Sequence, residues 1–148
     1  MPESPERSAH SLKLTGRSEV AERTVEFRFE KPQSFDFKAG QFMDLTLVDP
    51  PETDGEGNTR AFSINSAPDD PDLVFATRLR DTAFKRVLQS MPLGTVVEGY
   101  GPFGNLTLHN DTRRPVVLLA GGIGITPFLE EFRALERRNL RFTFVPTM

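Results

Sequence analysis

The chain contains no cysteine and only two histidines among its 148 residues. Without cysteine it forms no disulfide, uses no thiol nucleophile and holds no iron–sulfur cluster through its own side chains. The histidines, His10 and His109, lie far apart in the sequence. Because a transition-metal site needs several such ligands at close spacing, the sequence predicts no metal site.

Long apolar runs and basic clusters are also missing. No apolar run approaches the roughly 20 residues that cross a bilayer, so no membrane span is predicted. The net charge is −3, and without a basic patch we expect no nucleic-acid partner. The first eight residues, Met-Pro-Glu-Ser-Pro-Glu-Arg-Ser, lack the apolar centre of a signal peptide. We therefore expect a disordered tail over residues 1–8 and a cytoplasmic protein.

Most of the chain has a strand-rich pattern. Val25, Phe27 and Phe29 alternate with polar residues, as in a half-buried strand. Similar runs cover residues 43–47, 60–65, 73–79, 95–100 and 106–109, with turn-forming residues between them. The pattern predicts a mainly β fold, an antiparallel barrel or sandwich.

One helix is expected among these strands. Phe84, Val87, Leu88 and Met91 follow the spacing of one helix face. Either of the two preceding polar residues, Asp81 or Thr82, suits the N-cap position.

A second pattern lies near the end of the chain. An apolar run over residues 116–120 leads into three glycines and then into Thr126 and Pro127, which suit the start of a helix. Such a strand–turn–helix unit can bring backbone N–H groups close to a phosphate. The loop has neither the spacing of a triphosphate-binding loop nor that of a dinucleotide-binding Rossmann turn. Close packing alone also explains glycines at such a turn.

The tetrapeptide at residues 60–63 offers a second candidate site. Strand alternation places Arg60 and Phe62 on one face, and Ala61 and Ser63 on the other. A guanidinium suits a pyrophosphate, and a nearby hydroxyl can bond to a ring nitrogen. An exposed strand with one core phenylalanine explains the same residues.

The two patterns together resemble the ferredoxin–NADP reductase superfamily. Residues 40–42 (Gly-Gln-Phe) and 101–104 (Gly-Pro-Phe-Gly) also match turns of that family, in the same order. The resemblance covers roughly residues 10–130. It implies an antiparallel Greek-key flavin-binding barrel over residues 9–110, followed by an NAD(P)-binding α/β unit over residues 115–148.

The resemblance also implies roles for particular residues. Arg60 would hold the diphosphate of FAD, Phe62 would pack on the isoalloxazine, and Ser63 would bond near its N5. The cofactor-binding set is Arg60, Ala61, Phe62, Ser63, Thr82, Ala83, Phe84, Gly121, Gly122, Gly124 and Thr126. The glycines and Thr126 would receive NADH or NADPH. Ser63 and Thr126 lie nearest the expected hydride exchange, and are the catalytic candidates.

Two departures from the family concern the barrel. Phe62 stands where a tyrosine is common, which keeps the stacking face and loses a hydroxyl. The helix start has Asp81 and Thr82 where the family more often shows a glycine and a serine.

The third departure is the short nucleotide unit. The segment from residue 115 to residue 148 has room for about one strand–helix–strand unit of roughly 30 residues. Residues 128–136 look like a later helix of the family domain, which suggests an internal deletion after the Thr126–Pro127 turn and loss of the end. Since two parallel strands and one helix cannot cover both faces of a sheet, we expect a mobile unit, or one docked on the barrel or on a second copy in a homodimer. Binding of NADH or NADPH should be weak or lost.

The resemblance implies a flavin-dependent oxidoreductase. It would pass a hydride from NAD(P)H to FAD, and then electrons to an acceptor on another chain. Two alternatives stay open. The barrel is a flavin-binding module without catalysis, or it serves interaction alone and holds no cofactor.

Overall fold

The computed structural model describes residues 9–109, 111, 113–119 and 128. This part of the chain contains one helix and six strands, so the predicted mainly β fold is confirmed. The elements are β1 (Ala9–Ala21), β2 (Thr24–Glu30), β3 (Phe42–Thr46), β4 (Thr59–Ser63), β5 (Asp72–Arg78), α1 (Ala83–Ser90) and β6 (Val96–Phe103). The helix is not long and apolar enough to cross a membrane.

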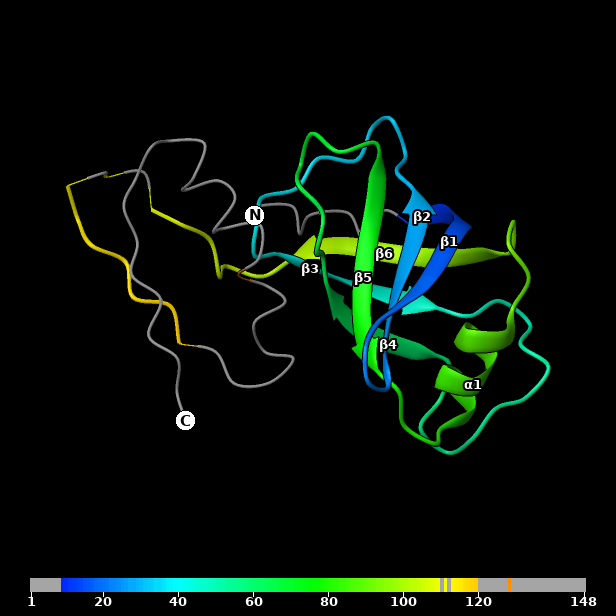
Figure 1. Ribbon diagram of the computed structural model, residues 1–148. Coiled ribbons are helices and arrows are strands. Elements are labelled where there is room, and N and C mark those ends of the chain that lie inside the picture. Colours follow the sequence, from blue (N-terminus) through cyan, green and yellow to red (C-terminus); the bar gives the residue numbers. More distant parts are fainter. Residues whose placement is uncertain (1–8, 110, 112, 120–127, 129–148) are drawn as a thin grey trace.

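The strands form one antiparallel six-stranded sheet with the order β4-β3-β6-β1-β2-β5. The last strand returns to lie between β1 and β3, as in a Greek-key connection. The two outermost strands, β4 and β5, also come into contact, so the sheet curves into a barrel (Figure 1).

The alternating residues of the strands supply the core. The expected inward residues of β2, namely Val25, Phe27 and Phe29, are 5%, 1% and 0% exposed. All six strands contribute to one apolar cluster, and α1 adds Phe84, Val87 and Leu88. Burial of this apolar surface is the main favourable term for the fold.

The helix begins where its sequence predicts. Thr82 is the N-cap, and its hydroxyl accepts a hydrogen bond from the Lys85 N–H at 3.4 Å. Asp81, the other cap candidate, instead forms an ion pair with Arg86. At the other end of α1, the Arg17 guanidinium donates to the carbonyls of Leu88 and Met91 at 3.2 and 3.0 Å.

Two predicted strands are not observed in the described residues, and one observed strand was not predicted. Residues 106–109 are not in a strand, and neither are residues 116–119, the described part of the run expected over residues 116–120. Leu106, Val117 and Leu119 are 52%, 81% and 83% exposed, so their apolar character does not reflect burial in a sheet. A strand needs a neighbouring strand for its backbone hydrogen bonds, and none of the described strands pairs with these residues.

β1 is the unrecognised strand, because few of its residues are apolar and buried. Several expectations lie outside the described residues. These are the tail over residues 1–8, the turn with Gly121, Gly122, Gly124 and Thr126, and all but the first residue of the helix expected over residues 128–136. The boundaries of the two expected domains stay predictions.

Candidate functional site

β4 forms the centre of the candidate site. Arg60 and Phe62 point to the same side of the strand, as alternation predicts, and both reach Phe84 of α1. The Arg60 guanidinium carbon lies 5.3 Å from the centre of the Phe84 ring. The Phe62 and Phe84 rings stack with their centres 5.9 Å apart. The barrel therefore places the arginine beside the beginning of the helix.

The other end of β4 brings three sequence motifs together. Ser63 pairs with Phe42 of β3, and Phe42 in turn pairs with Phe103 of β6. The Gln41 side-chain amide donates to the Gly104 carbonyl at 3.1 Å. The Gly-Gln-Phe and Gly-Pro-Phe-Gly turns thus meet beside Ser63.

The N-terminus of α1 holds a carboxylate. The Ala83 N–H donates to Oδ2 of Asp54 at 2.7 Å. The same carboxylate accepts the Glu56 N–H through its other oxygen at 3.0 Å. The Ala83 N–H, and then the Glu56 N–H, lower the pKa of Asp54, so that the group binds as an anion.

The Arg60 guanidinium also holds a carboxylate. Its Nη2 lies 2.7 Å from Oε2 of Glu56, with the arginine side chain 21% exposed. Its Nη1 donates to the carbonyls of Glu56, Gly57 and Thr59. The loop that precedes β4 therefore occupies most of the guanidinium's donors.

Lys85 adds positive charge to this region. Its ammonium donates to the Thr77 hydroxyl at 2.7 Å and to the Arg78 carbonyl at 2.6 Å. Burial lowers its pKa, and the charges of Arg80 and Arg60 act in the same direction. Those bonds hold the lysine against the end of β5.

The donor set fits a phosphate-bearing ligand. A guanidinium and a helix N-terminal N–H suit anions, because both present fixed donors with positive charge or dipole. In this structure each of them binds a carboxylate, from Glu56 and Asp54 respectively. The two donors therefore already bind anions, which are the chain's own carboxylates.

The surroundings of Phe62 are less open than its expected role requires. The side chain is 8% exposed and packs against Phe75 as well as Phe84. A flavin ring stacked on Phe62 would need one of these neighbours to move. The position of Phe62 as a flavin platform therefore stays a prediction.

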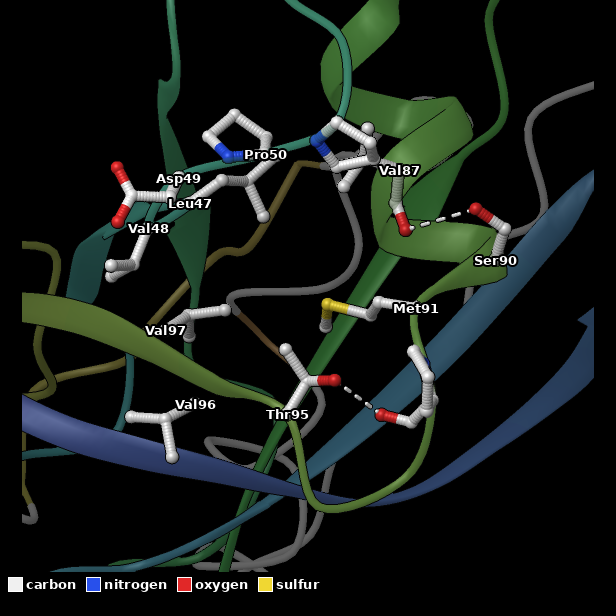
Figure 2. A pocket seen from close by; sticks show the side chains of 12 residues that line it. Leu47, Val48, Asp49, Pro50, Val87, Ser90, Met91, Thr95, Val96 and Val97 are labelled. Carbon is white, nitrogen blue, oxygen red and sulfur yellow. Dashed lines mark hydrogen bonds between the residues drawn. The ribbon is translucent and has the colours of Figure 1, made fainter.

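A separate hollow lies toward the other end of α1. It has a volume of about 240 Å³. Figure 2 shows Val87 and Ser90 of the helix and Met91 just after it on one side of the hollow, and Pro50 and Val97 on others. The expected cofactor-binding residues do not line this hollow.

Sequence reasoning missed the two carboxylates at the site. Asp54 and Glu56 belong to a loop that the pattern marked only as polar and turn-forming. Acidic residues at every second position, starting with Glu52, are the signal that could have drawn notice to them. The pyridine-nucleotide candidates at residues 121–126 lie outside the described part, so their geometry adds nothing to this site.

Known proteins similar to this chain are reductases. The reductase subunit of glycine betaine monooxygenase from Chromohalobacter salexigens is 33% identical over 114 residues, covering 75% of this chain and 30% of that protein. Ferredoxin–NADP reductase B from Sorangium cellulosum is 34% identical over 121 residues, covering 80% of this chain and 46% of that protein. No family model matches the chain.

Solved structures show the same kinship. A ferredoxin–NADP reductase from Neisseria gonorrhoeae, solved with bound FAD and NADP, has a TM-score of 0.68 and 25% identity. The match covers 88% of this chain and 53% of that one. The chain thus spans less than half the length of the two curated relatives. The resemblance seen in the sequence is confirmed, since homologues and structural neighbours alike are reductases of one type.

Proposed function

We propose that this chain, a homologue of the ferredoxin–NADP reductase-like reductases, binds FAD on its barrel and serves in electron transfer from NAD(P)H to a separate acceptor. One observation supports the proposal most directly. Arg60 and the N-terminus of α1 converge beside the Arg60–Ser63 strand, and both are engaged with anions. That is the arrangement a flavin diphosphate requires.

Residues at the two ends of β4 would bind different parts of FAD. The Arg60 guanidinium and the Ala83 N–H would bind the diphosphate at one end. The Ser63 hydroxyl, at the other end, would bond to the flavin ring near N5, between the turns that contain Gln41 and Gly104. The flavin itself supplies the hydride and electron chemistry.

The acceptor is proposed from the relatives. One of them is the reductase subunit of a monooxygenase, and another is a ferredoxin–NADP reductase. We therefore propose an oxygenase component or a ferredoxin as the electron acceptor, in the cytoplasm. The nucleotide-binding roles of Gly121, Gly122, Gly124 and Thr126 belong to this proposal, and so does a homodimer, for which no contact is described.

Titration with FAD, followed by flavin fluorescence, tests the proposal. The Arg60→Ala variant should bind FAD about 10- to 150-fold more weakly, because one hydrogen bond to a charged group contributes about 1.5–3 kcal/mol. Arg28→Ala is the matched control. Arg28 also pairs with a glutamate, Glu26, but on β2 and away from α1. Equal losses in both variants, or no FAD binding by the unaltered chain, would contradict the proposal.

Anaerobic addition of NADH or NADPH to the FAD-loaded protein separates the activities. Bleaching of the flavin absorbance would support the oxidoreductase and identify its donor. A flavin that binds and stays oxidised would contradict electron transfer from NAD(P)H and leave a flavin-binding module.

A further inference from the structure

The loop over residues 50–58, called here the acidic loop, passes around α1 before it enters β4 (Figure 1). Its three carboxylates each bind a different donor. Glu52 forms a two-pronged contact with Arg86 of α1, at 3.0 and 2.9 Å. Asp54 accepts the Ala83 N–H, and Glu56 pairs with Arg60.

Two of these donors are the ones proposed for the flavin diphosphate. The Ala83 N–H has one hydrogen, and Asp54 accepts it at 2.7 Å. The outer two nitrogens of Arg60 are engaged, because Nη2 points to Glu56 while Nη1 donates to loop carbonyls. A diphosphate that binds the Ala83 N–H and the Nη2 of Arg60 therefore competes with Asp54 and Glu56 for these donors.

The acidic loop is held mainly by these polar contacts. Every residue from 51 to 57 is exposed, so the loop buries little apolar surface. Pro50 and Pro51, at its beginning, border the hollow beside Val87 and Met91 (Figure 2). A segment with few buried contacts has a low free energy of local opening, which makes its displacement feasible.

We propose that Asp54 and Glu56 are internal anions that occupy the diphosphate-binding donors and thereby set the affinity of the barrel for its flavin. The proposal rests on the proposed function. Binding of FAD releases both carboxylates, while the Glu52–Arg86 contact lies outside the donor set and keeps the beginning of the loop on α1. Carboxylates that remained in place would face the diphosphate as like charges, which is unfavourable.

Neutral variants of the same shape test this role. Asp54→Asn combined with Glu56→Gln removes both charges and should bind FAD at least about tenfold more tightly, since the competing like charges are gone. Glu52→Gln is the matched control. It removes the same charge from the same loop, but from a residue that contacts Arg86. The control should keep the affinity of the unaltered chain within about twofold.

The single variants Asp54→Asn and Glu56→Gln are measured as well. Both positions are exposed, so the core is untouched in each. Tighter binding in either one relative to Glu52→Gln supports the proposal. Unchanged or weaker FAD binding in all three, or an equal gain in Glu52→Gln, would overturn it.

Inorganic pyrophosphate provides a second probe that does not depend on the flavin ring. The amide resonance of Ala83 is followed by NMR as pyrophosphate is added. A larger affinity in the double variant than in the unaltered chain supports the internal-anion role. If pyrophosphate behaves in this way while FAD binds to no variant, the proposed function fails, and with it the role of the loop in flavin affinity, whereas the competition of the two carboxylates with a diphosphate stands. If FAD binds to all variants equally and pyrophosphate shows no gain, the loop proposal alone fails.

Discussion

The two ends of α1 meet their charged partners in different ways. At the C-terminal end, Arg17 donates to the carbonyls of Leu88 and Met91. At the N-terminal end, Asp54 accepts the Ala83 N–H. Both contacts have the sign that a helix dipole favours. The helix itself has no acidic residue in its first turn and no basic residue in its last, so other parts of the chain supply both charges.

The difference between the two partners lies in what holds them. Arg17 belongs to β1, where it pairs with Phe27 in the sheet ladder. Asp54 belongs to the exposed acidic loop, which has no ladder. A partner fixed by a strand is a permanent part of the fold, whereas one fixed by a loop can be exchanged for a ligand. A binding site needs donors that the fold fixes and occupants that it does not.

The largest expected effect comes from removing the ring that joins the helix to the site. Phe84 is 2% exposed and contacts both Phe62 and Arg60. Phe84→Ala should lower the free energy of unfolding by about 3–5 kcal/mol, because it leaves a cavity. Denaturant unfolding measures the change, with Phe84→Leu as a milder control. A loss below about 1 kcal/mol would show that the N-terminal end of α1 does not depend on this packing.

The N-cap comes next. Thr82→Ala removes the hydroxyl that accepts the Lys85 N–H. The free energy of unfolding should fall by about 0.5–2 kcal/mol. Thr82→Ser keeps the hydroxyl and should therefore keep most of the stability of the unaltered chain. Thermal unfolding of the two variants side by side checks this. An equal loss in the serine variant would mean that the methyl group, and not the hydroxyl, matters at this position.

Arg17→Ala tests the C-terminal end of α1, where the partner of the helix belongs to a strand. Loss of the guanidinium from the last carbonyls of α1 should cost about 0.3–1 kcal/mol in unfolding free energy. FAD affinity should stay unchanged, since Arg17 contacts the end of the helix opposite Arg60. Arg17→Lys keeps the charge and serves as control. A weaker affinity for FAD in Arg17→Ala would break the distinction between the two ends.

The smallest effect is expected within the acidic loop. A methyl group added at Gly55 would meet no atom within 4 Å. Gly55→Ala should therefore change the free energy of unfolding by no more than about 0.5 kcal/mol, as for other surface substitutions. Denaturant unfolding provides the measurement. A large loss would show that the loop packs more tightly than its exposure indicates.

The barrel was predictable wherever side chains alternate clearly. Val25, Phe27 and Phe29 have the period of two that a half-buried strand imposes, and all three are buried. β1 was not recognised, because only Leu12 and Leu14 are buried in it and its role is to join the two halves of the sheet. Apolar composition alone misled over residues 106–109, where no neighbouring strand completes a ladder.

Local patterns in the sequence predict the mainly β fold, a helix capped by Asp81 or Thr82, and the shared face of Arg60 and Phe62. Each of these depends on neighbours in the chain, through periodicity and capping. That α1 starts beside Arg60, and that Asp54 and Glu56 occupy the donors there, follows from the packing of the folded chain. The same packing places Arg17 at the other end of the helix. The contacts of Asp54 with Ala83 and of Arg17 with Met91 join residues 29 and 74 positions apart, and how the strands pair, not a local pattern, brings such residues together.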